Sequence, residues 1–207
     1  MSEHVAVVLA AGGSRRLGRP KQLLQRDGQA LVQRALGLAR STQPRRTLLV
    51  LGAQAEAIAG CLDLQGIERV DNPHWASGLS SSVRRAREAL GSSSLESEVG
   101  SVLFLVCDQP ALETTHLQAL LTAARATARG CAATVHGARL GVPAVIPWRE
   151  LADAPLQGDA GLRGLLNGED AASIARVPAP ALALDLDTPE DVRAAIARGW
   201  LDPDQAG

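Results

Sequence analysis

Short apolar runs alternate with amphipathic stretches along this chain. Residues 4–10 and 102–107 are almost wholly apolar, which predicts strands buried on both faces of a sheet. Residues 29–40 carry apolar side chains at helical spacing, which predicts an amphipathic helix. Further strands are predicted at 47–51, 67–70, 132–136, 144–146, 174–177 and 183–186. Further helices are predicted at 53–62, 80–90, 115–127 and 189–198.

This alternation predicts a doubly wound, mostly parallel, three-layer α/β/α fold. We expect a single domain over residues 1–207, because no internal repeat or linker divides the chain. The Ser-rich residues 91–100 predict a surface loop. Sheets of this kind bind ligands beyond the carboxyl ends of their strands, so polar motifs at predicted strand ends are the candidates for function.

Composition narrows the possible partners. The 207 residues include 21 Lys and Arg against 22 Asp and Glu, and only 2% are aromatic, which argues against a nucleic-acid partner. The apolar runs are too short for a membrane span and the N-terminus lacks signal-peptide features, so we expect a cytoplasmic protein with no membrane partner. The sequence holds one lysine, Lys21, where the compact ammonium can serve a purpose that arginine cannot.

Residues 9–24 form the most informative motif. Their sequence is Leu-Ala-Ala-Gly-Gly-Ser-Arg-Arg-Leu-Gly-Arg-Pro-Lys-Gln-Leu-Leu. The motif begins at the end of the first predicted strand, 4–10. A glycine-rich turn after a buried strand lets backbone N–H groups approach a phosphate chain, and four of the 21 basic residues lie at positions 15–21. The motif matches neither the dinucleotide-binding nor the P-loop pattern. A turn with solvated arginines is the alternative, but glycine, charge and strand end together favour phosphate binding.

Two acidic motifs also lie at predicted strand ends. Asp108 follows the strand at 102–107, where a carboxylate either holds Mg²⁺ together with substrate phosphates or caps a turn. Asp185 and Asp187 are two residues apart on a predicted strand, so both side chains are expected on the same side of the sheet. Thr188 then suits the N-cap of the last helix. Asp187 is therefore the candidate partner of Asp108.

Two further stretches each allow two interpretations. Residues 78–83, Gly-Leu-Ser-Ser-Ser-Val, open a predicted helix, and their polar groups either read a base or ribose or simply cap the helix. Asp159 and Arg163 either form the wall of a second substrate site, with Arg163 holding an anion, or belong to a capped surface helix. No Ser/His/Asp or His/Cys arrangement stands out, so we expect neither triad nor zinc chemistry.

Together these motifs resemble the nucleotidyltransferase family that includes the molybdenum cofactor cytidylyltransferases and guanylyltransferases. The resemblance spans nearly the whole chain and is most specific in residues 9–24. It implies a Rossmann-like fold, a catalytic set of Lys21, Arg16 and Asp108, and Mg²⁺ held by Asp108 and Asp187. Asp159 and Arg163 are the candidate acceptor-binding residues from the motif above. The implied nucleotide-binding residues are Leu9, Ala10, Ala11, Gly12, Gly13, Ser14, Arg16, Lys21, Gly78 and Ser82.

Details within the motifs are similar to the cytidylyl branch, namely Ala-Ala-Gly at 10–12 and Pro20 before Lys21. Val142 stands where many cytidylyl members have histidine. The resemblance implies transfer of CMP from CTP to the terminal phosphate of molybdopterin with release of pyrophosphate, and transient contact with a molybdoenzyme. The alternatives are a GTP-dependent enzyme on the same pterin, a sugar- or polyol-phosphate nucleotidyltransferase, and a non-catalytic carrier of the cofactor.

Overall fold

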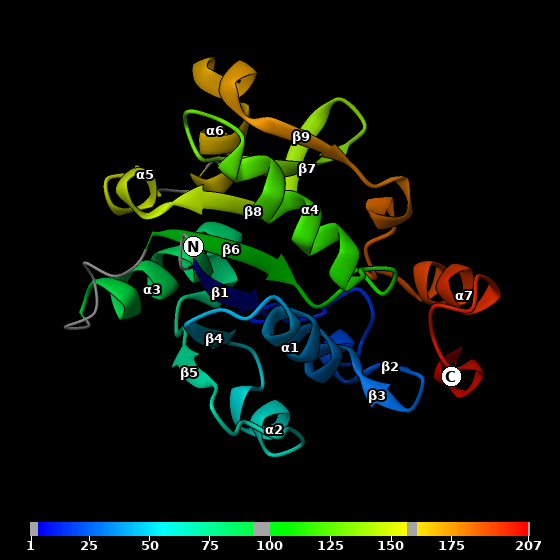
Figure 1. Ribbon diagram of the computed structural model, residues 1–207. Helices are drawn as coiled ribbons and strands as arrows, with labels where there is room; N and C mark the ends of the chain where they lie inside the picture. Colours follow the sequence, from blue (N-terminus) through cyan, green and yellow to red (C-terminus); the bar gives the residue numbers. More distant parts are fainter. Residues whose placement is uncertain (1–3, 93–99, 157–160, 207) are drawn as a thin grey trace.

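A seven-stranded sheet lies between two layers of helices in the computed structural model, which describes residues 4–92, 100–156 and 161–206 (Figure 1). The strands are β1 (His4–Leu9), β4 (Arg46–Leu51), β5 (Glu68–Asp71), β6 (Ser101–Val106), β7 (Ala132–His136), β8 (Arg139–Pro147) and β9 (Ala175–Pro178). The helices are α1 (Leu31–Ser41), α2 (Ala55–Ala59), α3 (Leu79–Gly91), α4 (Thr114–Arg125), α5 (Trp148–Ala152), α6 (Gly161–Asn167) and α7 (Pro189–Ala197). The predicted three-layer α/β fold is confirmed.

The strand order is β5-β4-β1-β6-β8-β7-β9, and the sheet is mostly parallel. Only β8 runs against its neighbours, β6 and β7. From β1 the chain crosses to β4 and then β5 on one side, whereas β6 pairs with the opposite edge of β1. The order therefore reverses between β1 and β6, and a crevice opens at such a point beyond the carboxyl ends of the two strands.

The two faces of β1 belong to two separate hydrophobic clusters. Val5, Val7 and Leu9 pack on the face that α3, α5 and α6 cover, whereas Ala6 and Val8 pack beneath α1 and α4. This alternation follows from the period of two along a strand. Because both faces are covered, β1 is apolar from Val5 to Leu9, and this packing holds the end of the strand in place.

The segment that leads into the last helix differs from the prediction. Residues 184–187 form no strand, and a single backbone hydrogen bond, from Leu186 N to Asp108 O (3.1 Å), ties them to the end of β6. The prediction of a strand at 183–186 is therefore wrong. The helix after it begins as predicted: Thr188 and Asp191 form a capping box, with Asp191 N donating to Thr188 Oγ1 (3.3 Å) and Thr188 N to Asp191 Oδ2 (2.8 Å).

Smaller differences concern lengths and one missed hairpin. Helix α2 is half as long as the predicted stretch, and β8 extends well before residue 144. A two-stranded hairpin, β2 (Gln25–Arg26) with β3 (Gln29–Ala30), precedes α1 and was not predicted. Most of the predicted loop at 91–100 lies outside the described residues. Within the described part of the chain, no helix combines the length and apolarity that a membrane crossing requires.

Candidate active site

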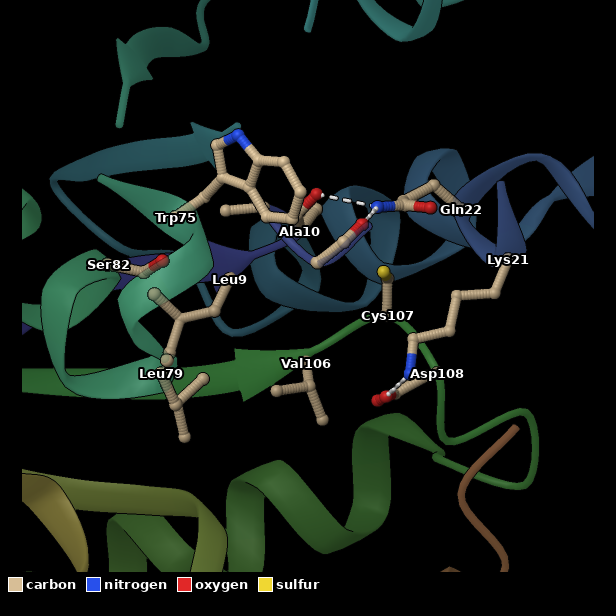
Figure 2. A pocket seen from close by; sticks show the side chains of 13 residues that line it. Leu9, Ala10, Lys21, Gln22, Trp75, Leu79, Ser82, Val106, Cys107 and Asp108 are labelled. Atoms are coloured by element: carbon tan, nitrogen blue, oxygen red, sulfur yellow. Dashed lines mark hydrogen bonds and ion pairs between the residues drawn. The ribbon is translucent and has the colours of Figure 1, made fainter. Parts of the chain in front are cut away.

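A cavity of about 220 Å³ occupies the crevice between the carboxyl ends of β1 and β6 (Figure 2). Seven of the predicted nucleotide-binding residues line it, and so does Asp108. Gly13, Ser14 and Arg16 were predicted with them but do not line the cavity. The residues along its wall are Leu9, Ala10, Ala11, Gly12, Lys21, Gln22, Trp75, Gly78, Leu79, Ser82, Val106, Cys107 and Asp108.

The loop after β1 is fixed by a buried glutamine that the sequence analysis did not single out. The Gln22 side chain is 1% exposed, and its Nε2 donates to the carbonyl oxygens of Ala10 (2.9 Å) and Gly12 (2.7 Å). Ser14 Oγ accepts from the backbone N–H of Lys21 (3.0 Å), which closes the other end of the loop. The two Gln22 bonds use carbonyl oxygens, so the glycine-rich backbone beside the cavity forms a preformed rim.

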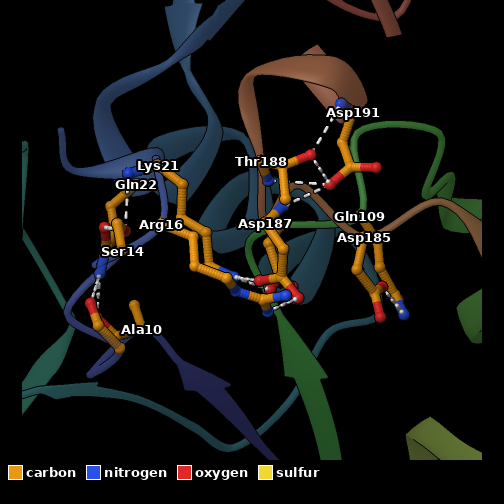
Figure 3. A network of polar contacts seen from close by, with 12 residues as sticks. Ala10, Ser14, Arg16, Lys21, Gln22, Gln109, Asp185, Asp187, Thr188 and Asp191 are labelled. Atoms are coloured by element: carbon orange, nitrogen blue, oxygen red, sulfur yellow. Dashed lines mark hydrogen bonds and ion pairs between the residues drawn. The ribbon is translucent and has the colours of Figure 1, made fainter. Parts of the chain in front are cut away.

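Lys21 lies between the two predicted metal ligands. Its Nζ is 2.5 Å from Asp108 Oδ2 and 2.9 Å from Asp187 Oδ1, and Arg16 Nη2 is 2.7 Å from Asp187 Oδ2 (Figure 3). Burial alone would lower the pKa of Lys21, but the two carboxylates outweigh it and raise that pKa above its ordinary value. The ammonium therefore stays charged. Arg16 and Lys21 from the first motif thus lie in one network of ion pairs with two carboxylates from distant motifs, Asp108 and Asp187.

The same carboxylates fit a divalent cation. Asp108 Oδ1 is buried and has no hydrogen-bond partner among the described residues, so it is free to accept a ligand bond. The described residues hold no group of three or more His, Cys, Asp and Glu side chains around a common point. A Mg²⁺ ion characteristically takes one or two carboxylates and completes its shell with water and substrate phosphates, so Asp108 and Asp187 suit it in the presence of a triphosphate.

Asp185 and Asp187 do not face the same way. Asp187 contacts Lys21 and Arg16, whereas Asp185 Oδ1 accepts from Gln109 Nε2 (3.2 Å) at a different cavity (Figure 3). The expectation of a common side fails because residues 184–187 are not a strand. The pKa of Asp185 is raised to about 6, first by burial and then by the Asp108 carboxylate. The Asp185 residue is nevertheless exposed to solvent at the mouth of that cavity.

The serine run after Gly78 is a buried network and not a helix cap. Helix α3 has Gly78 as its N-cap, at φ 96°, and no side chain caps it. Ser81 and Ser82 are instead buried and receive hydrogen bonds from Asn72 Nδ2, at 2.8 and 3.0 Å. Asn72, at the end of β5, thus sets the position of Ser82 in the cavity wall.

A second cavity of about 500 Å³ adjoins the first, and Leu79 lines both. Arg163 lines the second cavity, as does Val142, whose carbonyl oxygen accepts from Gln109 Nε2 (3.3 Å) and contacts His136 Nε2 (2.9 Å). Asp159 lies outside the described residues. The lining of this cavity is Leu79, Gln109, His136, Arg139, Leu140, Gly141, Val142, Leu162, Arg163, Leu166, Ala183 and Asp185.

Comparison with known proteins identifies the family of this chain. Residues 6–175 match the family model described as the MobA-like NTP transferase domain. The chain belongs to this family. Nicotine blue oxidoreductase of Paenarthrobacter nicotinovorans is 33% identical over 168 residues, which cover 77% of this chain and 79% of that protein. Membership confirms the family resemblance drawn from the motifs.

Solved structures of similar proteins extend the comparison to nearly the whole chain. A homologue of Mycobacterium tuberculosis Rv0371c from Mycobacterium sp. strain JC1 has 28% identity and a TM-score of 0.74, covering 96% of this chain and 97% of that one. Rv0371c from M. tuberculosis H37Rv, in complex with manganese, has 25% identity and a TM-score of 0.70, covering 95% and 98%. This MobA-like domain therefore has a relative that binds a divalent metal.

Proposed function

We propose that this MobA-like domain is a Mg²⁺-dependent cytidylyltransferase that transfers CMP from CTP to the terminal phosphate of molybdopterin. The observation that carries the proposal is the meeting of Lys21, Asp108 and Asp187 beside a cavity rimmed by the loop after β1. A cation and two carboxylates at the rim of a glycine-rich loop suit a metal-bound triphosphate. The Ala-Ala-Gly sequence at 10–12 supports CTP over GTP.

In the proposed reaction an oxygen of the acceptor phosphate attacks the α-phosphorus of CTP. A new P–O bond forms there while the bond to the β-phosphate breaks, and pyrophosphate leaves. A phosphate oxygen is already a competent nucleophile, so alignment and charge stabilisation are the main demands. Lys21 and Arg16 would hold the triphosphate, and the backbone at Ala10 to Gly12 would contact the nucleotide. Mg²⁺, held by Asp108 and Asp187, would neutralise the charge that develops on the phosphates.

The second cavity is the proposed acceptor site. It adjoins the nucleotide cavity at Leu79, it is larger, and its wall combines apolar side chains with Arg139 and Arg163. Neither arginine has an ion pair to an acidic residue in the described part of the chain, so both are available to an anionic acceptor. Asp159 is proposed as a further acceptor-binding residue from the sequence motif alone. A transient contact with a molybdoenzyme would follow from the product.

Other activities remain distinct outcomes of one assay. A guanylyltransferase on the same pterin, or a sugar- or polyol-phosphate nucleotidyltransferase, would use the same Lys21 and Asp108 with a different base or acceptor. A non-catalytic carrier would have no need of these charged groups. The relative named as an oxidoreductase raises redox chemistry as a separate candidate, which would give no pyrophosphate release in this assay. The paired carboxylates and lysine favour nucleotidyl transfer, because they serve triphosphate and metal rather than electron transfer.

The test is release of pyrophosphate by purified protein with Mg²⁺, molybdenum-loaded molybdopterin and CTP, GTP, ATP or UTP in parallel. Release with CTP alone is expected. Release with GTP alone would assign the protein to the guanylyl branch. Release only when a sugar or polyol phosphate replaces the pterin would assign another acceptor, and no release despite pterin binding would favour the carrier. Asp108→Asn serves as the control for contaminating activity.

A further inference from the structure

Trp75 is seated against two glycines that come from different loops. It begins the short 3₁₀ turn Trp75–Ser77 before α3 and lines the nucleotide cavity (Figure 2). A Cβ atom added at Gly13 would lie 2.6 Å from Trp75 Cζ3, and one added at Gly52 would lie 2.5 Å from Trp75 Cβ. Both distances are far inside van der Waals contact. The tryptophan can therefore approach the loops after β1 and β4 only because neither position has a side chain.

A cation and a backbone contact further restrict the indole. The guanidinium of Arg15 lies over the ring, 5.5 Å from its centroid, at a distance typical of cation–π attraction. The backbone N–H of Gly78, three residues further along the chain, donates to the Trp75 carbonyl oxygen (3.2 Å) and closes the turn. The close approach to the two glycines and the Arg15 guanidinium thus restrict the indole, which forms a wall of the cavity next to Ala10 (Figure 2).

The cavity is small, so the position of the Trp75 indole limits what can bind in it. At about 220 Å³ the cavity is below the usual range of about 300–1,000 Å³ for small-molecule sites. Lys21 and Asp108 mark the triphosphate side, so the base must lie toward Gly78, Ser82 and Trp75. A purine has two fused rings and a pyrimidine one. The rigid indole therefore occupies room that the second ring of a purine would need.

We propose that Trp75 is a specificity-determining residue that limits the nucleotide cavity to a pyrimidine base. The proposal rests on the proposed nucleotidyl transfer and adds the residue that selects the base by size. Trp75 takes no part in the transfer itself. The same indole also packs against the core. If its role were purely structural, a substitution would change kcat/KM for CTP and GTP equally. If it selects the base, a substitution changes the ratio of the two kcat/KM values.

The test replaces Trp75 by leucine and by phenylalanine. Pyrophosphate release gives kcat/KM for CTP and GTP separately, and circular dichroism confirms folding. We expect Trp75→Leu to raise the GTP/CTP ratio of kcat/KM by about tenfold or more, the scale on which pocket size discriminates substrates. Trp75→Phe, which keeps one ring, should give a smaller change. Unchanged ratios in folded variants would overturn the proposal.

Trp200 provides a matched control. It is also partly buried and also has an arginine over its ring, Arg198 at 5.1 Å, but it lines neither cavity. Trp200→Leu should therefore leave the GTP/CTP ratio unchanged even where it lowers stability. A shift as large as that of Trp75→Leu would show that the ratio reports general loosening and would overturn the proposal.

A binding measurement separates this proposal from the proposed function. The chain has three tryptophans, so replacing Trp148 and Trp200 by phenylalanine leaves Trp75 as the only indole fluorophore. Titration with CTP and GTP in the absence of acceptor should change its fluorescence at lower concentrations of CTP. This result without pyrophosphate release would refute the transferase and keep the base selection. Equal affinities for the two nucleotides would refute the selection while leaving transfer intact.

Gly13→Ala provides an independent perturbation of the same wall. The added methyl group must displace the indole, and displacement toward the cavity should weaken CTP binding. Combining it with Trp75→Leu removes the clash, so the double variant should bind CTP more tightly than Gly13→Ala alone. Strict additivity of the two substitutions would indicate that Gly13 does not act through Trp75 and would count against the proposal.

Discussion

Removal of the Lys21 charge should destabilise the protein in a way that a divalent metal reverses. Lys21 is the only positive group on Asp108 in the described residues, whereas Asp187 also contacts Arg16. Lys21→Met keeps much of the length of the side chain and removes the ammonium. The two carboxylates then repel each other, and Asp108 loses its partner in a mostly buried position.

The expected loss of stability follows from the burial of the Lys21–Asp108 ion pair. The Lys21 and Asp108 side chains are 14% and 17% exposed, and removing one partner of a buried pair costs about 3–5 kcal/mol. The Asp187 side chain is 41% exposed, so loss of its ion pair with Lys21 should cost only the ~0–1 kcal/mol typical of surface pairs. Because Asp108 is not fully enclosed, we expect about 3 kcal/mol in free energy of unfolding. That corresponds to a fall in Tm of about 6–12 °C for a chain of this size.

The assay is thermal unfolding in EDTA, in Mg²⁺ and in Mn²⁺, followed by circular dichroism. A cation bound by Asp108 and Asp187 replaces the missing charge, so metal should raise the Tm of Lys21→Met more than that of the wild type. Arg16→Met is the matched control, because the Arg16 side chain is 68% exposed and its loss should cost less than about 1 kcal/mol.

Three results would refute this reasoning. If Lys21→Met and the wild type unfold at the same temperature in EDTA, the ammonium does not compensate the carboxylates in the folded state. If metal stabilises the wild type more than the variant, Lys21 and the metal do not share the same pair of ligands. Equal losses for Arg16→Met and Lys21→Met would show that burial does not govern the cost.

Three further substitutions test the site and the fold. Asp108→Asn should lower kcat by about 10²–10³ while the circular dichroism spectrum is kept, and near-wild-type turnover would contradict the proposed metal site. Burial and the charge of Arg125 lower the pKa of His4 to about 4, so the unfolded chain takes up a proton below about pH 6.5 that the folded chain does not. The free energy of unfolding should therefore fall by about 2 kcal/mol between pH 6.5 and pH 5. Urea unfolding at several pH values measures this pH dependence, and His4→Gln should weaken it. An equally strong pH dependence in His4→Gln would exclude His4 as its source. Thr188→Ala removes the cap of α7 and should cost about 1 kcal/mol, whereas an unchanged Tm would mean that the capping box contributes nothing.

The sequence predicted the sheet well where strands are buried on both faces. In β1 and β6, continuous apolar runs leave no other interpretation, and their ends locate the cavity. The segment at 183–186 misled because alternating Leu and Asp residues have the period of a strand. In the structure Leu184 and Leu186 both pack into the small cluster against α7, and only Leu186 N bonds to the chain just after β6, at Asp108 O. Period alone cannot reveal that a ladder partner is missing.

The sequence singled out the charged residues that the structure brings together, but it did not single out Gln22 or Trp75. Lys21, Asp108 and Asp187 attract attention because ionised groups at strand ends need a reason. Gln22 and Trp75 carry no such signal, because their importance comes from contacts with Ala10, Gly12 and Gly13 that only the fold creates. The hairpin β2–β3 could have been found, since Asp27 and Gly28 form a dipeptide typical of tight turns.

The contact of Lys21 with Asp187 joins residues 166 positions apart and has a consequence for the order of biosynthesis. A domain generally folds as a unit, even though its chain is made from the N-terminus. Every described residue that lines the nucleotide cavity lies at or before Asp108, whereas Asp187 follows only near the end of the sequence. The two carboxylates therefore meet around Lys21 only when the whole domain has folded. A chain that stopped short of residue 187 would contain every cavity-lining residue and lack the second carboxylate.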